Sequence, residues 1–213
     1  MRVVGGSLRG RRLAAPRSQA VRPTTDRARE ALFNILEHAY PGSLQGARVL
    51  DLFAGSGALG IEALSRGAQY CLFVETAAAA RALIRENVEA LGLVGATRIF
   101  RRDATHLGPV GTMAPFSLVL ADPPYGRGLG EGAIASALAG GWLAPDALIV
   151  VEEAAATPFE PPAGIHLHER RAYSATTLAF CGLDWRHAVP AHAGAGAPWP
   201  NVLAGCHRAA RGH

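Results

Sequence analysis

Short apolar segments alternate with longer helical ones through the middle of this 213-residue chain, and this alternation restricts the folds open to it. The apolar runs predict five short strands, and apolar residues at helical spacing between them predict helices. Strands that alternate with helices are typical of a mostly parallel α/β sheet with helices on both faces. The strands are expected at 48–53, 70–74, 97–101, 116–121 and 147–151, and the helices at 59–66, 77–91 and 130–140.

The segments outside this alternating region divide the chain into three parts. Residues 2–14 hold short apolar runs between glycines and predict two short strands that form a small basic hairpin. A helix is expected from Asp26 to about Tyr40, and residues 165–173 and 176–180 predict a closing antiparallel hairpin. The parts are an N-terminal hairpin and linker (1–25), a main domain (26–182) and a poorly ordered tail (183–213) rich in alanine, glycine, proline and histidine.

Positive charge gathers at the N-terminus. The whole chain has a formal net charge of +4, whereas residues 1–30 hold eight arginines and two acids, a net charge of +6. All 21 basic residues are arginines, which we attribute to a composition bias, so the choice of arginine over lysine carries no argument. The charge itself suits a surface that binds phosphates.

A glycine-rich turn follows the first expected strand. Gly55, Gly57 and Gly60 spell GxGxxG between that strand and the next helix. Glycines at such a turn let the backbone approach a ligand closely, and the start of the helix offers free N–H groups. Taken alone, this motif equally fits a nicotinamide dinucleotide site or a plain tight turn.

Three acids at strand ends favour another cofactor. Glu75 ends the second strand, where a carboxylate can accept hydrogen bonds from ribose hydroxyls. Asp51 lies inside the end of the first strand, where it would attract the ammonium of an amino-acid moiety. A dinucleotide site usually has no charge there, because the pyrophosphate is anionic. Asp103, after the third strand, is placed to accept from an adenine amino group.

The sequence Asp122-Pro123-Pro124-Tyr125 directly follows the strand at 116–121 and is the most specific signal in the chain. Two prolines fix the backbone just past the carboxyl end of a strand, where open α/β sheets bind ligands. The Asp122 carboxylate and the Pro123 carbonyl would then match the two N–H donors of a planar amine and align its nitrogen with a methyl donor. Tyr125 can stack on the face of a base.

In this order, the motifs resemble those of class I methyltransferases that act on amino nitrogens. The closer resemblance is to the bacterial 16S rRNA guanine-N2 methyltransferase family of RsmD type, over about residues 1–182. It is carried by Arg2-Val3-Val4-Gly5-Gly6, Leu8-Arg9-Gly10-Arg11, Arg22-Pro23-Thr24-Thr25-Asp26-Arg27, Arg29-Glu30, Leu32-Phe33-Asn34 and Asp51-Leu52-Phe53-Ala54-Gly55-Ser56-Gly57. The segment 173–176 lacks a glycine that the family tends to carry there, and the tail beyond Leu183 has no counterpart that we identify.

This resemblance implies a Rossmann-like fold with a seven-stranded sheet and S-adenosylmethionine as the methyl donor. It implies a 16S rRNA substrate within a partly assembled small subunit, and an RNA-binding role in rRNA processing. The stretch from Arg22 to Arg29 would help to close the active site. The catalytic candidates are Asp122, Pro123 and Tyr125. The cofactor-binding candidates are Asp51, Phe53, Gly55, Ser56, Gly57, Glu75, Asp103, Ala104 and Asp122. The RNA-binding candidates are Arg2, Arg9, Arg11, Arg12, Arg22, Arg27 and Arg127.

Other functions stay open on the sequence alone. Adenine-N6 and protein glutamine-N5 methyltransferases use a similar proline turn, usually with asparagine in the first position. The basic N-terminus favours nucleic acid over protein but does not separate RNA from DNA. A non-catalytic RNA-binding assembly factor could keep the fold, although the intact Asp122 and glycine loop disfavour it.

Three scattered cysteines form no disulfide framework, and no apolar run approaches the length of about 20 residues that crosses a membrane. These features predict a cytoplasmic protein. The histidines and the cysteine of the tail lack the regular spacing of a metal site, so no metal is expected. Nothing in the sequence demands a dimer, and a monomer is expected.

Overall fold

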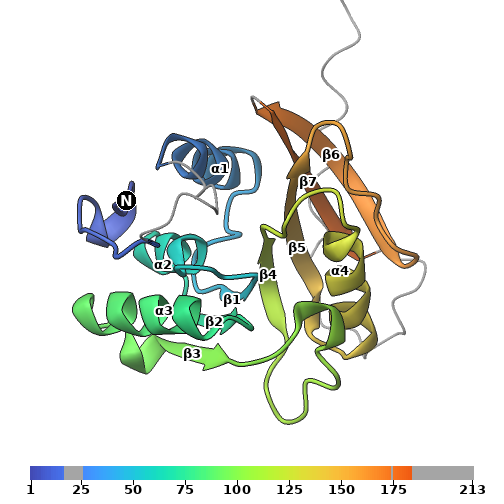
Figure 1. Cartoon of the computed structure of the whole chain (residues 1–213). Coiled ribbons are helices and arrows are strands. Elements are labelled where there is room, and N and C mark those ends of the chain that lie inside the picture. Colours follow the sequence, from blue (N-terminus) through green and yellow to red (C-terminus); the bar gives the residue numbers. More distant parts are fainter. Residues whose placement is uncertain (17–25, 174, 184–213) are drawn as a thin grey trace, which may run out of the picture.

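The computed structural model describes residues 1–16, 26–173 and 175–183, and within them a seven-stranded sheet forms the centre of the molecule (Figure 1). The strand order is β3-β2-β1-β4-β5-β7-β6. Neighbouring strands from β3 through β5 are parallel, and β7 runs antiparallel to both β5 and β6. This is the mostly parallel sheet with a closing hairpin that the sequence predicts. The strands are β1 (Arg48–Leu52), β2 (Tyr70–Val74), β3 (Thr97–Phe100), β4 (Phe116–Ala121), β5 (Leu143–Ala154), β6 (Ile165–Tyr173) and β7 (Thr176–Leu183).

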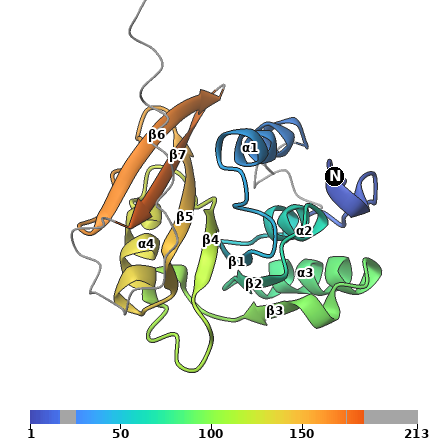
Figure 2. The ribbon, with the colours of Figure 1, turned by 180° about the vertical axis from the view of Figure 1, so that it is seen from behind.

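Helices cover both faces of this sheet, as Figures 1 and 2 show. Val49, Phe73 and Leu118 point to one face and pack in one core with α1, α2 and α3. Leu50, Leu72 and their neighbours point to the other face, where they pack with α4 and Trp142. Because both faces are buried, these strands are apolar throughout rather than alternating. The helices are α1 (Asp26–Ala39), α2 (Ala58–Ser65), α3 (Ala78–Ala90) and α4 (Leu129–Ala139), with short 3₁₀ turns η1 (Gly6–Leu8), η2 (Val94–Ala96) and η3 (Ala104–His106).

The N-terminal segment corrects one expectation. The chain doubles back through a single antiparallel bridge between Arg2 and Arg12, and η1 takes the place of the regular strands predicted for 2–14. The reason is that α2 binds the polar backbone groups that a strand would pair. The Glu62 carboxylate accepts the N–H groups of Val4 and Gly5 at 2.9 and 2.7 Å, and Ser65 Oγ accepts that of Leu8 at 2.9 Å.

Strand β5 is longer than expected, since it begins at Leu143 rather than Ala147. Its first residue pairs with Phe116 of β4, and a register shift between Phe116 and Leu118 accommodates the exposed residues that follow. At its other end β5 continues through two acids, which are buried because β7 pairs with them. In the described part of the chain no helix is both long and apolar enough to cross a membrane. Most of the expected linker at 15–25, from residue 17 onward, and the tail beyond Leu183 lie outside the described residues.

Candidate functional site

The candidate site lies at the carboxyl edge of the parallel strands. Strand β1 lies between β2 and β4. The chain adds β2 and β3 on one side of β1 and then crosses over to add β4 and β5 on the other side. Open α/β sheets bind ligands at such a switch point. The loops after β1, β2, β3 and β4 all emerge at this edge, and every cofactor-binding and catalytic candidate lies on one of them or on the adjoining strand end.

Three residues of the loop after β1 have positive φ angles. Phe53 has φ of 61°, a left-handed conformation that is uncommon outside glycine, and Gly55 and Gly57 follow with φ of 56° and 79°. Gly60, in α2, packs so closely on β2 that a Cβ there would lie 2.4 Å from Cys71 Sγ. The first two glycines of the motif therefore permit the turn, and the third allows α2 to contact the sheet.

Asp51 is fully buried beneath this loop. Its Oδ2 accepts the N–H of Gly60 at 2.9 Å, whereas its Oδ1 is buried and has no hydrogen-bond partner among the described residues. Burial, followed by the negative charges of Asp122 and Glu75, raises the pKa of Asp51 to about 8. A buried carboxylate oxygen without a donor is costly and would be stabilised by a bound cation. The expected ammonium-binding role of Asp51 is compatible with this geometry.

Glu75 and Asp103 are placed along the same edge by the ends of β2 and β3. The Glu75 carboxylate accepts the N–H of Gly55 at 2.9 Å and that of Ala77 at 2.8 Å, so it also fixes the glycine loop. Asp103 caps η3 by accepting from the backbone and hydroxyl of Thr105, and these hydrogen bonds hold the pKa of Asp103 below its usual range. Ala104 is buried beside it.

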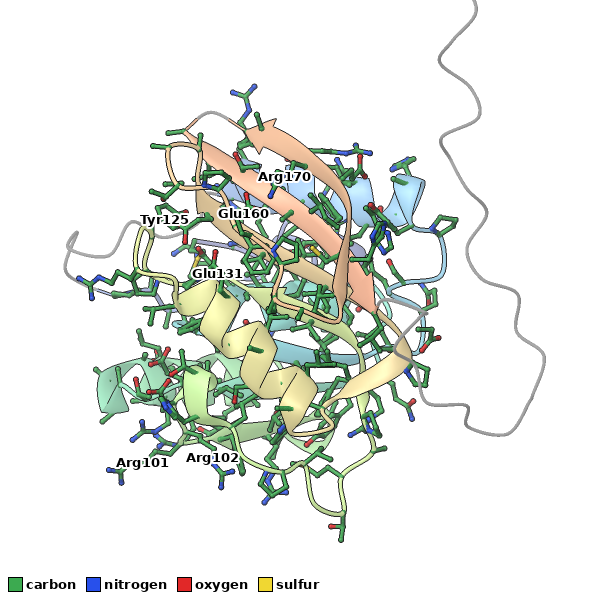
Figure 3. All side chains as sticks on the ribbon, turned by 90° about the vertical axis from the view of Figure 1, so that its right-hand side faces the viewer. Arg101, Arg102, Tyr125, Glu131, Glu160 and Arg170 are labelled. Carbon is green, nitrogen blue, oxygen red and sulfur yellow. The ribbon has the colours of Figure 1, made fainter. Side chains whose placement is uncertain are left out.

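The turn at 122–125 is anchored to β5 by two acids. The Tyr125 hydroxyl donates to Glu152 Oε1 at 2.7 Å, and the N–H of Gly126 donates to Glu153 Oε1 at 2.9 Å. Burial and the charge of Asp122 raise the pKa of the Tyr125 phenol above its ordinary value, so it remains a donor. The ring is 41% exposed, which leaves surface for stacking (Figure 3).

Three residues at this site were missed by the sequence argument. Glu152 and Glu153 had a signal, because they interrupt the apolar strand at its carboxyl end, but a strand end usually exposes its charges. Asn87 had none: it is one polar residue on an amphipathic helix. It is buried in α3, where it accepts the N–H of Ala14 at 2.7 Å and donates to the carbonyls of Ala14 and Ser56 at 3.1 and 2.9 Å.

The RNA-binding candidates lie mostly on the surface. Six of them are exposed: Arg2, Arg9, Arg11, Arg12, Arg27 and Arg127. Arg22 lies outside the described residues. Arg29, which the sequence counts with the surface charge, is completely buried and pairs with Asp26 and Glu62. It fastens α1 to α2 and so does not belong to a phosphate-binding surface. Arg101 and Arg102 point outward near the end of β3 (Figure 3).

The arrangement offers a small polar site with hydrogen-bond acceptors at its floor. The glycine loop leaves room for a ligand, since a Cβ at Gly55 would meet nothing closer than the Phe53 carbonyl at 4.0 Å. Acidic side chains lie at or just beyond the carboxyl ends of four adjacent strands, and they suit a ligand that is rich in N–H and O–H donors. No group of histidine, cysteine, aspartate and glutamate side chains in the described residues could hold a metal ion. Such a site can bind an amino-acid-bearing nucleoside next to a base.

Comparisons with known proteins agree with this architecture. A family model described as conserved hypothetical protein 95 matches residues 1–182. Ribosomal RNA small subunit methyltransferase D of Escherichia coli K12 is 43% identical over 152 residues, which cover 71% of this chain and 74% of that protein. The protein of the same name from Haemophilus influenzae is 35% identical over 164 residues, with coverages of 76% and 83%. The solved structure of the E. coli protein yhhF has a TM-score of 0.71 and 36% identity, and covers 85% of this chain and 96% of that one.

Proposed function

Because the chain belongs to the RsmD family of ribosomal RNA methyltransferases, we propose that it transfers a methyl group from S-adenosylmethionine to the exocyclic N2 amine of a guanine in 16S rRNA. The chain is an rRNA methyltransferase by this membership, and the donor, the guanine and the small-subunit RNA are the finer steps of the proposal. The observation that carries them is the proline turn at 122–125, which is tethered to β5 beside the glycine loop and the unpaired Asp51 oxygen.

The residues at the edge fit S-adenosylmethionine. Asp51 Oδ1 is a buried acceptor suited to the ammonium group. Glu75 holds the glycine loop and keeps lone pairs for the ribose hydroxyls, and Asp103 can accept from the adenine amine. Phe53, Ser56, Gly57 and Ala104 would line the same cradle. When bound, this cofactor supplies a methyl group activated by its sulfonium sulfur.

The proline turn binds the amine that accepts the methyl group. The Asp122 carboxylate and the Pro123 carbonyl accept the two N–H bonds of the amine, while Tyr125 stacks on the base. Holding both hydrogens directs the nitrogen lone pair toward the methyl carbon. The amine nitrogen would gain positive charge as it takes up the methyl group, and Asp122 would stabilise that charge and accept the proton that the amine gives up.

The substrate is expected to be a partly assembled small subunit bound by a monomer of this protein. The basic N-terminal residues would contact the phosphates, together with Arg127 just past the proline turn. The exposed arginines and the family resemblance support this part of the proposal.

The test is mass mapping of methylated nucleotides in rRNA from cells with and without the gene. One N2-methylguanine of 16S rRNA should vanish without the gene and return with the wild-type chain. Asp122→Ala should lower methyl transfer by about 10²–10³-fold, because the amine loses its charged acceptor. S-adenosylhomocysteine should still raise the Tm of this variant, since the cofactor groups remain.

Asp146→Ala is the matched control, since Asp146 is an exposed acid near the opposite end of β5. It should restore the modification fully. Loss of a methylated adenine in place of the guanine, or normal turnover by Asp122→Ala, would refute the proposal.

A further inference from the structure

Glu152 lies next to the catalytic candidate Asp122 in the sheet. Ala121 of β4 pairs with Val151 of β5 in parallel register, so the next residues, Asp122 and Glu152, emerge side by side at the carboxyl edge. Tyr125 connects the two strand ends, because its hydroxyl donates to Glu152 Oε1 at 2.7 Å. Glu152 therefore lies beside the turn on which the proposed base would stack.

Glu152 is only 9% exposed, and no arginine or histidine of the described residues forms an ion pair with it. The neighbouring Glu153 differs, because its Oε1 accepts the backbone N–H groups of both Gly126 and Ala154. Glu153 therefore stabilises the conformation of the turn. Glu152 Oε2 accepts no hydrogen bond in the described part of the chain, and it is not fully enclosed by the protein, so a bound group can reach it.

A second acceptor beside Asp122 matches one base better than the other. Guanine presents its N1–H directly next to its N2 amine, so this edge carries three adjacent N–H bonds. Adenine presents an acceptor, N1, next to its N6 amine, and would face Glu152 with two lone pairs opposed. Enzymes that act on an extruded base identify it by hydrogen bonds to this edge together with stacking.

We infer that Glu152 determines the base specificity: its free carboxylate oxygen accepts the N1–H of the target guanine while the proline turn holds the N2 amine. This inference depends on the proposed function. Tyr125 has a double role in it, since its ring stacks on the base and its hydroxyl orients Glu152. Unpaired buried groups reject a substrate that lacks the matching donor, so Glu152 would disfavour adenine.

The experiment replaces the target guanine by 2-aminopurine, which keeps the 2-amine but has an acceptor at N1. The position is first identified by the mass mapping described above, and the analogue is placed there in a ligated 16S rRNA assembled into small subunits. The wild-type enzyme should methylate guanine with a kcat/KM at least about 100-fold above that for 2-aminopurine. Glu152→Gln should lower this ratio by about 100-fold, because its amide N–H can donate to the analogue's N1.

Two variants serve as controls. Tyr125→Phe removes the hydroxyl but leaves the carboxylate, and Glu153→Gln weakens the anchor of the turn. Tyr125→Phe should lower the ratio in part, because Glu152 loses the hydroxyl that orients it, whereas Glu153→Gln should lower kcat for both substrates by similar factors and leave the ratio unchanged. A purely structural role for Glu152 would likewise leave the ratio unchanged in Glu152→Gln, so the ratio separates the two roles.

Equal methylation of guanine and 2-aminopurine by the wild-type enzyme would overturn the inference without any variant, even if Glu152→Gln failed to fold. An unchanged ratio in a folded Glu152→Gln would overturn it as well. Both outcomes leave guanine methylation intact. Failure of the proposed function is distinguishable, because the mass mapping would then reveal no guanine that depends on the gene.

Discussion

At the scale of single residues, Asp51 combines a structural hydrogen bond with the ligand-binding role proposed for it. One carboxylate oxygen holds the N–H of Gly60 in the first turn of α2, and the other is buried without a partner in the described structure. Since burial raises its pKa to about 8, the group carries a proton for most of the time at pH 7 in the absence of a ligand. A cation bound beside it favours the carboxylate and displaces that proton.

Binding of S-adenosylhomocysteine should therefore release protons. Below a pH of about 8 the ligand's ammonium must displace the Asp51 proton, so affinity should increase as pH rises from 6 to 8 and then level off. Calorimetry at pH 7 in buffers of different ionisation enthalpy measures the protons directly. Asp51→Asn, which cannot ionise, should bind more weakly and release none. Equal proton release by the wild type and this variant would exclude Asp51 as the ammonium-binding group.

Residues also define what sequence reasoning could and could not find at this site. The glycine loop, the acids at strand ends and the proline turn were all predicted, because each follows a recognisable strand and the ends of parallel strands meet at one edge. Glu152 was missed because its burial depends on pairing with Leu178 of β7, a strand distant in sequence. The burial of Arg29, which was counted only in the N-terminal charge, was not predicted for the same kind of reason, since its partner Glu62 lies on another helix.

At the scale of elements, the predicted helices and strands agree with the structure where a continuous apolar run marks a strand or apolar residues at helical spacing mark a helix. Strands β2 and β4 have the predicted bounds, and α1 ends one residue before the expected Tyr40. The N-terminal hairpin forms as predicted, with its two arms joined by an antiparallel bridge, but the two regular strands predicted for it do not. The carboxylate of Glu62 and the hydroxyl of Ser65 bind the N–H groups of Val4, Gly5 and Leu8 instead. No local pattern contains these distant acceptors.

Helix α3 links the N-terminal segment to the glycine loop through Asn87. Its side chain binds both backbone groups of Ala14 and the carbonyl of Ser56, so one amide joins two segments that are far apart in sequence. Because Asn87 is only 2% exposed, water cannot easily replace these bonds. The position of the glycine loop therefore depends on how the N-terminal segment is attached.

Replacing Asn87 by alanine should destabilise the protein by about 2–3 kcal/mol, since buried polar groups lose their partners. The same variant should bind S-adenosylhomocysteine more weakly, because the Ser56 carbonyl is no longer fixed. Urea unfolding and calorimetric titration measure the two effects. Asn34→Ala, on the exposed face of α1, is the matched control and should change neither. If the two variants behave alike, Asn87 does not connect the segments.

At the scale of the whole molecule, a buried ionic network holds the basic N-terminal segment in a fixed position. The Glu62 carboxylate accepts the N–H groups of Val4 and Gly5, and it pairs with Arg29 of α1 and, at 2.9 Å, with Arg66, the residue after α2. Arg29 Nε and Nη1 have no hydrogen-bond partner among the described residues, so the two short hydrogen bonds from Glu62 hold the segment in place. The exposed arginines of the segment therefore keep a defined place relative to α2, whose first turn follows the glycine loop (Figure 1).

This fixed charge predicts how salt affects RNA binding. Arg9, Arg11 and Arg12 are exposed, and within the described residues only Arg11 makes a hydrogen bond through its guanidinium, to the carbonyl of Ala90. If each contacts one phosphate, replacing all three by alanine should reduce the slope of log K against log salt by about 2–3. Filter binding of 16S rRNA at salt concentrations from roughly 50 to 300 mM measures this slope.

Arg171→Ala is the control for lost charge alone. Arg171 lies on β6, at the far edge of the sheet from the N-terminal segment, and pairs with Glu169 at 3.0 Å. Its removal should leave the slope unchanged, because nonspecific attraction falls off within about a Debye length. A triple variant whose slope equals that of the wild type would move the RNA surface away from the N-terminus. Weaker binding with an unchanged slope would have the same meaning, since the arginines would then act through the fold rather than on phosphates.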